Sequence, residues 1–171
     1  MQTSDWLGVL NILIAFLGVF IVGFTIFEWR KLRELRKDME GIEARTDRRI
    51  HAQLKSAHRI LASYQISDVD ARIAILEEAV RECPQAFNGF NALGFAYLEK
   101  GDLPRAIDAF SSAVAHHPED KAGYCDLAYA HHKARNVELT LKYLRKAVEV
   151  DASARADILG DDRFAGIRGQ M

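Results

Sequence analysis

Histidine and cysteine are the residues of this sequence that could bind a metal ion or supply a nucleophile. The chain has six histidines and two cysteines: His51, His58, His116, His117, His131, His132, Cys83 and Cys125. Zinc ligands on a helix lie three or four residues apart or form a CxxC pair, whereas adjacent histidines point to different faces. We therefore predict no metal and no cofactor. The imidazoles are expected to be solvated or packed at an edge, and the cysteines to be small core or groove residues of a reduced compartment.

Adjacent carboxylates are the second set of residues that could do chemistry. Glu77–Glu78 and Asp161–Asp162 are such pairs, but neighbouring acids on exposed helices or turns usually serve as solvating charges. The sequence contains no glycine-rich phosphate loop, no GxSxG elbow and no HExxH. We predict that the protein is not an enzyme.

The composition indicates an all-helical protein. Of the 171 residues, 49% are hydrophobic but only 9% are aromatic, and three are proline. Such a mixture, rich in Ala, Leu, Glu, Lys and Arg, favours helices in one modest domain with appendages. The net charge of −1 gives no electrostatic reason to expect nucleic acid as a partner. The expected fold class is all-α.

The longest apolar run, residues 6–27, carries no charged side chain. A helix of that length covers about 30 Å, the thickness of the hydrocarbon core of a bilayer. A buried core helix would rarely be so long in so small a domain, and a cleaved signal peptide would begin with Lys or Arg, which residues 1–5 lack. We predict one transmembrane helix over residues 6–27, after a short extracytoplasmic N-terminus of residues 1–5.

Basic residues crowd the segment that follows the apolar run. Five of them come directly after it: Arg30, Lys31, Arg33, Arg36 and Lys37. Because cationic flanks stay in the cytoplasm, the N-terminus is expected outside and everything after residue 28 inside. The expected location is the inner membrane of a bacterium, with a single pass. The same cations would contact anionic lipid headgroups.

A long basic helix is expected over residues 28–66, which contain one glycine and no proline. A seam of side chains at heptad spacing is small or polar inside the apolar run and apolar beyond it: Asn11, Ala15, Gly18, Val22, Thr25, Leu32, Leu35, Met39 and Ile42. Such a seam suits close packing of helices in a bilayer and a coiled coil outside it. The hypothesis is a homo-oligomer, or pairing with another subunit's membrane helix. The alternative is chance periodicity, because few heptads lie outside the membrane.

Beyond residue 60 similar residues recur in the sequence at a constant interval. This interval equals the separation of Pro84 and Pro118 along the chain. Similar side chains recur in three series: Phe90, Leu93 and Gly94 as Tyr124, Leu127 and Ala128; Leu76 as Phe110 and Leu144; Ala79 as Ala113 and Ala147. The small residues are expected where helices cross closely, with the large ones filling the spaces between. Asp68, Asp102 and Asn136 are expected to cap the second helix of each copy. Pro84 and Pro118 are expected to end that helix and preset the first turn of the next.

These positions resemble the signature of the tetratricopeptide repeat family. The best copy, residues 87–120, reads Phe90-x-x-Leu93-Gly94-x-x-Tyr97, then Ala106-x-x-x-Phe110-x-x-Ala113 and Pro118. Residues 121–152 are a second copy that departs from the pattern at His131, Thr140 and Leu144, and residues 53–86 are a partial one. The resemblance implies a short α-solenoid of helix-turn-helix repeats over 67–152 with a capping segment, 153–171.

The two ends of the array depart from a regular repeat. Ser56 and Arg59 stand where bulky apolar residues belong in the first copy, so the end of the connecting helix is expected to substitute for its first helix. Four apolar residues of the capping segment are expected to cover the last repeat: Ile158, Leu159, Phe164 and Ile167.

In this family the first helices line a concave groove that binds ligands. Carried over to this chain, the resemblance places eight residues in it: Asn88, Asn91, Phe95, Glu99, Cys125, Tyr129, His132 and Lys133. It implies a protein partner bound through a peptide segment, with asparagines bonding its backbone and Phe95 and Tyr129 offering apolar pockets. The alternative is that the closing helix or the connecting helix fills so short a groove.

The expected function is that of a membrane-anchored scaffold whose cytoplasmic repeats recruit or position partner proteins. The alternative is a structural or assembly subunit of a larger membrane protein complex, built in through its membrane helix. A lipid- or metal-responsive regulator is a third reading, which rests only on the basic flank and the histidines.

Overall fold

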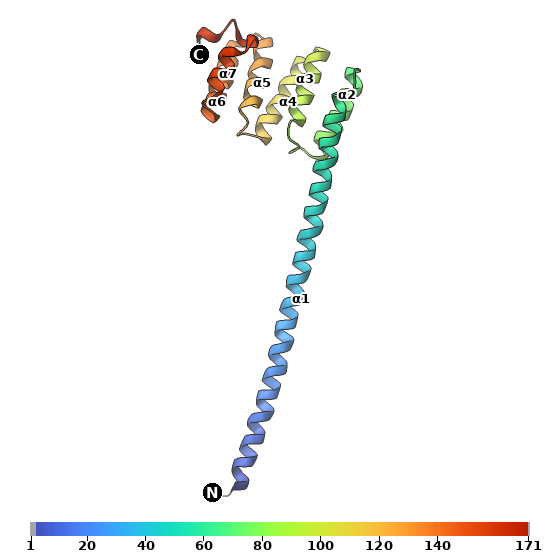
Figure 1. Ribbon diagram of the computed structural model, residues 1–171, viewed down its shortest axis with the longest axis vertical. Coiled ribbons are helices and arrows are strands. Elements are labelled where there is room, and N and C mark those ends of the chain that lie inside the picture. The colour runs from blue at the N-terminus through green and yellow to red at the C-terminus, as the bar shows by residue number, and fades with distance from the viewer. Residues whose placement is uncertain (1–2, 171) are drawn as a thin grey trace. The chain divides into compact units, whose positions relative to one another are not determined.

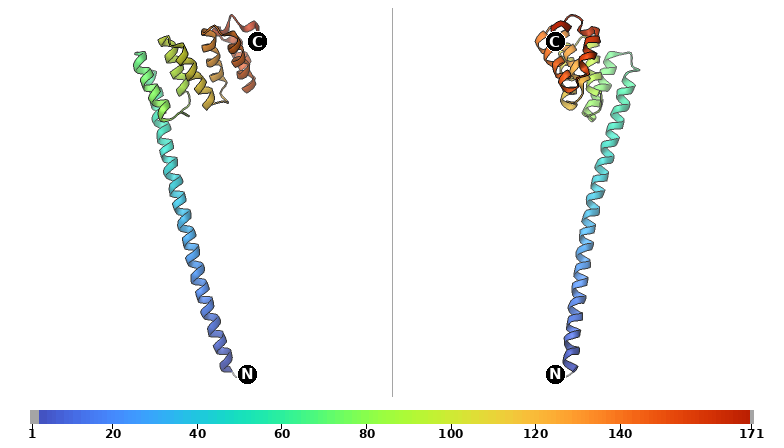
Figure 2. Two further views of the ribbon diagram at one scale, coloured as in Figure 1. Left: turned by 180° about the vertical axis from the view of Figure 1, so that it is seen from behind. Right: turned by 60° about the vertical axis from the view of Figure 1, so that its left-hand side comes forward.

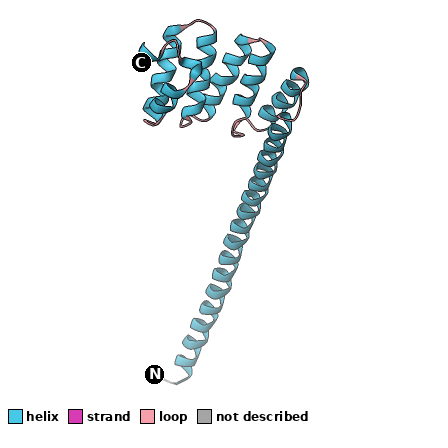
Figure 3. Cartoon of the chain, turned by 45° about the horizontal axis from the view of Figure 1, so that its top comes forward, coloured by secondary structure: helices cyan, strands magenta, loops and turns pink. Residues whose placement is uncertain are grey.

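The protein is built from helices throughout the part that the structure describes. A computed structural model describes residues 3–170, which hold seven α-helices and two short 3-10 helices and no strand (Figures 1 and 3). The all-α class predicted from the composition is confirmed.

The helices follow one another with short turns between them. Their bounds are α1 Thr3–Ser63, α2 Val69–Glu82, α3 Gly89–Lys100, α4 Leu103–His116, α5 Lys121–Lys133, α6 Val137–Val150, α7 Ala154–Gly160, η1 Asp162–Phe164 and η2 Arg168–Gln170. The chain divides into two compact units, Met1–Arg49 and Ile50–Met171. This division falls inside α1, within the segment 28–66 that the sequence predicts as one helix. The last turns of α1 belong to the second unit, whereas the earlier part of that segment belongs to the first.

The first unit consists of the greater part of α1. Every side chain over residues 6–27 is exposed, and α1 holds a stretch long and apolar enough to cross a membrane, none of which is buried. The hydroxyl of Thr25 donates to the carbonyl oxygen of Val22 at 2.8 Å, so this polar member of the seam is satisfied within its own helix. Residues 1 and 2 of the expected N-terminus lie outside the described residues, as does Met171.

The second unit shows the predicted repeat period in its helices. The second helix of each pair begins at Val69, Leu103 and Val137, and ends at Glu82, His116 and Val150. The three predicted N-caps are confirmed, because each side-chain oxygen accepts a hydrogen bond from a backbone N–H in the first turn of its helix. Asp68 accepts from Asp70 at 2.8 Å, Asp102 from Arg105 at 3.3 Å and Asn136 from Leu139 at 3.0 Å. In Figure 2 the helix pairs lie side by side in chain order.

Small and large residues interlock in the core as predicted. A Cβ atom at Gly94 would lie 2.7 Å from the ring of Phe110, so glycine is what allows α3 and α4 to approach this closely. Ala128 is fully buried at the matching place in the next repeat. The large residues between them, Leu76, Phe110 and Leu144, are also fully buried.

The two repeat prolines do only half of what the sequence predicted. Pro84 and Pro118 do follow the ends of α2 and α4, but neither lies in the first turn of the next helix, so that part of the prediction is wrong. Backbone turns separate Pro84 from α3: the N–H of Ala86 donates to the carbonyl oxygen of Cys83, and the N–H of Gly89 donates to the carbonyl oxygen of Ala86. The helical proline is instead Pro104, in the first turn of α4, where no backbone donor is needed.

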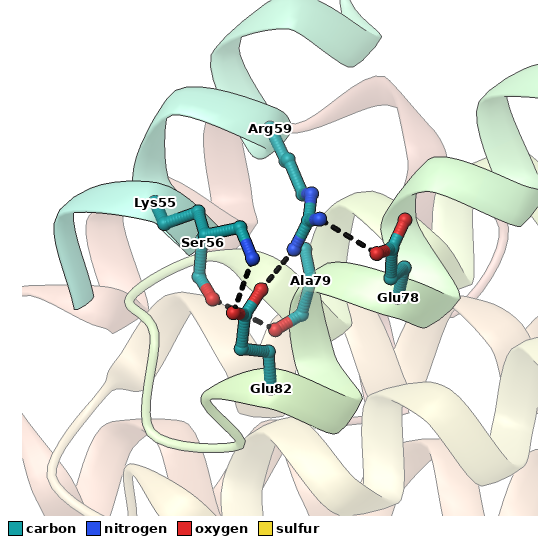
Figure 4. A network of polar contacts seen from close by, with 6 residues as sticks. All are labelled: Lys55, Ser56, Arg59, Glu78, Ala79 and Glu82. Carbon is teal, nitrogen blue, oxygen red and sulfur yellow. Dashed lines mark hydrogen bonds and ion pairs between the residues drawn. The ribbon is translucent and has the colours of Figure 1, made fainter. Parts of the chain in front are cut away.

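The end of α1 pairs with α2 and supplies the missing first helix of the array (Figure 4). The hydroxyl of Ser56, fully buried, donates to the carbonyl oxygen of Ala79 at 3.0 Å. Arg59 bonds Glu78 at 2.6 Å and also Glu82. At Ser56 and Arg59, hydrogen bonds and ion pairs thus replace the apolar contacts that the family pattern would place there.

The closing segment covers the last repeat with three of its four expected apolar residues. Ile158, Phe164 and Ile167 are buried against α5 and α6 together with their neighbours. Leu159 is 48% exposed, so its predicted role as a cover residue is wrong. It follows Ile158 directly, and adjacent residues of a helix point to different faces.

The turn between the two helices contains a left-handed residue in the pairs α3–α4 and α5–α6. Gly101 has φ 84° and Arg135, at the matching place of the next repeat, has φ 59°. An L-residue in this conformation is strained by about 1–2 kcal/mol, whereas glycine adopts it freely but loses about 0.5–1 kcal/mol of chain entropy on folding.

We therefore expect Arg135→Gly to raise the stability of the protein by up to about 1 kcal/mol and Gly101→Ala to lower it by about 1 kcal/mol. Thermal unfolding in detergent, followed by circular dichroism, measures both. Gly160→Ala, at an open position without positive φ, is the control and should change little. If both turn substitutions shift the midpoint in the same direction, the strain assignment is wrong.

Candidate functional site

The first helices of the repeats are the end of α1, α3 and α5, and their shared face is named the first-helix face. Leu61, Phe95 and Tyr129 occupy matching places on these helices, one repeat apart from each other. An open hollow of about 490 Å³, the central hollow, lies on this face and is lined by Phe95, Leu98, Glu99, Gly101, Leu103, Tyr129, Lys133 and Arg163. Repeat stacking thus brings side chains from α3, α5 and the closing segment to one place.

The central hollow contains four of the eight residues predicted to line a groove: Phe95, Glu99, Tyr129 and Lys133. Its two aromatic walls are held from behind. The ring of Phe95 meets that of Phe110 edge to face at 5.1 Å, and the ring of Tyr129 meets that of Phe164 in the same way at 6.5 Å. Because their positions are fixed by buried rings, little order would be lost when a ligand enters.

Charged groups stand at the rim of the central hollow. Glu99 accepts two hydrogen bonds from the guanidinium of Arg72, at 2.8 and 3.0 Å. The guanidinium of Arg163 lies 5.2 Å from the ring centre of Tyr129, and the Nζ atom of Lys133 lies 5.5 Å from it. Two cations therefore flank one aromatic ring, a cation–π arrangement.

Asn91 is not available to bind a peptide, although the family resemblance placed it in the groove. Its side chain is only 7% exposed, and its amide donates to Asp126 Oδ2 at 2.9 Å. Arg163 donates to the other oxygen of the same carboxylate at 3.0 Å. Burial raises the pKa of Asp126, and the hydrogen bonds from Arg163 and Asn91 oppose that rise. This carboxylate joins α3, α5 and the closing segment.

Cys125 and His132, two further predicted groove residues, lie against the closing segment. Cys125 lines a small separate hollow of about 140 Å³ together with Asp157 and Arg163, and the ring of His132 is 6.5 Å from that of Phe164. Burial raises the pKa of the Cys125 thiol to about 11, and the neighbouring Asp126 adds to the rise. The thiol is therefore protonated near neutral pH and a poor nucleophile.

Asn88, the last predicted groove residue, lies apart from the central hollow. It borders a second hollow of about 480 Å³, the first-repeat hollow, lined by Gln53, Ala57, Ile60, Leu61, Tyr64, Gln85, Ala86, Phe87 and Asn88. Its amide donates to the hydroxyl of Tyr64 at 2.8 Å. Sequence reasoning missed Leu61, Tyr64 and Phe87. The signal for Leu61 was the repeat period itself, because Leu61 stands one repeat before Phe95.

Two of the remaining histidines stack on aromatic rings. His116 stacks on Phe90 at 5.4 Å and His131 on Tyr143 at 5.3 Å, and burial lowers the pKa of His131. Among the described residues, no three His, Cys, Asp or Glu side chains gather as a metal site. The first-helix face therefore offers the best-defined place for binding.

The adjacent acids of α2 have separate partners. Glu77 accepts a hydrogen bond from the hydroxyl of Tyr97. Burial and that carboxylate raise the pKa of Tyr97 to about 12. Glu78 pairs with Arg59. The two carboxylates thus serve different contacts and do not act as a pair.

Comparisons with known proteins do not identify a family for this chain. No protein-family model and no curated protein matches it. Among solved structures, MamA AMB-1 is similar over 58% of this chain and 56% of its own, with 23% sequence identity and a TM-score of 0.48. The present chain therefore spans little more than half of that structure.

We expect Arg163→Met to lower stability by about 1–3 kcal/mol, because it leaves the largely buried carboxylate of Asp126 without its cation. Adding Asp126→Asn should recover part of the loss. A coupling free energy above about 0.5 kcal/mol in this double-mutant cycle, measured by chemical denaturation, supports the assignment.

Arg155→Met is the matched control, since Arg155 is an exposed arginine of the neighbouring helix α7. It should leave the midpoint nearly unchanged. Additive effects of the two substitutions at Asp126 and Arg163 would show that the ion pair does not hold the closing segment.

Proposed function

We propose that the protein is a single-pass membrane adaptor whose helical repeats bind a segment of a partner protein on the first-helix face. The observation that carries this proposal is the central hollow, an open space whose aromatic walls are fixed and whose rim is charged. Such a hollow suits apolar side chains of a ligand, with polar groups at its edge to set orientation. Binding of this kind requires no catalytic group.

The polar groups of the first-helix face support binding of an extended chain. The amide nitrogen of Asn88 is used by Tyr64, and its carbonyl oxygen remains as an acceptor for a backbone N–H of a ligand. The hydroxyl of Tyr129 and the two cations beside its ring offer further polar contacts. An extended ligand would place alternate side chains toward the face and bond through its backbone.

The apolar stretch of α1 supports the membrane anchor. Its large apolar side chains, from Trp6 to Phe27, are exposed and no other part of the first unit covers them. A patch of this size in water would cause aggregation, whereas a lipid bilayer solvates it. The basic cluster that follows, Arg30 to Lys37, would lie at the headgroups and keep the repeats in the cytoplasm.

The seam beyond the apolar stretch supports contact with a second helix. Four apolar side chains there are more than half exposed: Leu32, Leu35, Met39 and Ile42. A coiled-coil partner, from another copy or from another subunit, would remove them from water. This observation favours the second candidate function, a subunit built into a membrane complex through α1.

The membrane orientation has a direct test. With a fluorescent protein fused after Met171, we expect signal in the membrane fraction that resists alkaline extraction. With an alkaline phosphatase that is active only outside the cytoplasm, we expect no activity, because the cationic flank holds the C-terminal unit inside. Recovery of the first fusion in the soluble fraction, or an active phosphatase, would contradict the anchor or its orientation.

Partner capture tests the first-helix face. We expect the double substitution Phe95→Ala and Tyr129→Ala to reduce recovery of co-purified partners in mild detergent by tenfold or more, because about 1.5–3 kcal/mol is gained when each large apolar side chain is buried. The matched control is Leu159→Ser, an exposed apolar residue that lines neither hollow. Unchanged partners in the double variant would reject the face as the binding surface.

A helix exchange separates the two candidate functions. Replacing residues 6–42 by an unrelated membrane helix with a basic flank should leave capture intact in an adaptor. Loss of the partner in that exchange, together with retention in the Phe95/Tyr129 variant, would favour the built-in subunit and the helix seam.

A further inference from the structure

The first-repeat hollow has a neutral lining. None of the residues that border it carries a charge. Leu61, Tyr64 and Phe87 are 67%, 56% and 75% exposed, so that apolar surface around this hollow faces solvent. An apolar ligand side chain would gain from burial there, whereas a charged one would lose water without finding a partner of opposite charge.

The central hollow differs in having one charge that is not neutralised. The carboxylate of Glu99 and the guanidinium of Arg163 already have partners of opposite charge. Among the described residues, the only charge-related contact of Lys133 is the face of the Tyr129 ring. A carboxylate from outside the chain would complete this site, since it is the natural partner of an ammonium group.

The repeat geometry sets the interval between the two hollows. Lys133 lies on α5, whereas the first-repeat hollow lies between the end of α1 and the start of α3. Neighbouring helices pack about 8–10 Å apart, so the first-repeat hollow and α5 are about 15 Å apart across the helices. Lys133 is the last residue of α5 and lies about 10 Å further along the helix axis than the middle of the hollow, which brings the distance to about 18–20 Å. An extended chain advances about 3.3 Å per residue and covers that distance in about six residues.

We propose that the ligand is an extended segment of a partner protein that carries a large apolar residue and, about six residues away, an acidic residue. The apolar side chain occupies the first-repeat hollow, and the carboxylate pairs with Lys133. This inference rests on the proposed function, because it assigns the chemistry of the ligand on the same face. It excludes a basic segment, which would place like charges together at Lys133.

The probes are fluorescein-labelled synthetic peptides of serine and alanine that carry one Phe and one Asp. The interval between these two residues is lengthened one residue at a time, and binding to the full chain in detergent micelles is followed by fluorescence anisotropy. The tightest binding is expected at an interval of about six. At that interval, Asp→Asn in the peptide should weaken binding about twofold to fivefold, and Phe→Ser about tenfold or more.

A charge series at Lys133 gives the sharpest test. Lys133→Gln should abolish the preference for Asp over Asn, and Lys133→Glu should reverse the preference between Phe–Asp and Phe–Lys peptides. Lys142→Glu is the matched control, because Lys142 also lies over a tyrosine ring, 5.7 Å from that of Tyr143, but lines neither hollow. It should leave the preference unchanged. All variants should keep the circular dichroism of the parent.

Phe87→Ser tests the other anchor. This substitution at an exposed side chain should weaken every Phe-containing peptide and leave the preference for Asp intact. An Asp preference that survives Lys133→Glu overturns the carboxylate assignment, and Phe binding that is insensitive to Phe87→Ser overturns the apolar one.

The ligand chemistry and the adaptor function can fail separately. If no peptide of the series binds, while partner capture by the full chain still depends on Phe95 and Tyr129, the ligand chemistry is wrong and the adaptor function stands. If neither peptides nor partners depend on the first-helix face, both are wrong.

Discussion

A short helical array has two end faces that no further repeat covers, and the structure of this protein depends on how they are closed. At the first end, the last turns of α1 replace a repeat helix, with the buried Ser56 hydroxyl on the Ala79 carbonyl and Arg59 on two glutamates of α2. At the other end, Ile158 and Phe164 seal α5 and α6. With few repeats between them, the two closures determine which part of the first-helix face stays open.

The closing segment also limits where a ligand can bind. Its Arg163 donates a hydrogen bond to the carboxylate of Asp126, and the amide of Asn91 donates to the same carboxylate. Cys125 lies against the same segment with a protonated thiol. What remains open is one hollow with an unneutralised cation and another without charge. This difference in electrostatics is a basis for specificity, because a ligand must satisfy both hollows at a fixed interval.

The repeat period made most of the helical fold predictable. Small residues such as Gly94 and caps such as Asn136 recur at fixed places because each copy must solve the same packing and hydrogen-bonding problem. Prediction failed where a position has more than one physical solution. Pro84 can end one helix without starting the next, and Leu159 points away from the core although it is as apolar as Ile158. Of the groove residues that the family resemblance implied, Phe95 and Tyr129 line the central hollow, whereas Asn91 is buried against Asp126.

The sequence by itself determined the all-helical class, the interval of the repeats, the caps and the long apolar stretch, because these follow from periodicity and composition along the chain. Only the tertiary structure decided which polar side chains are free to bind. The amide of Asn91 and the ammonium of Lys133 both lie at groove positions. The amide of Asn91 donates its hydrogen bond to Asp126, whereas Lys133, among the described residues, has a tyrosine ring beside it and no carboxylate. The reason is physical: the partner that neutralises a group stands far away in the sequence, as Arg163 does from Asp126, and becomes its neighbour only when the helices pack.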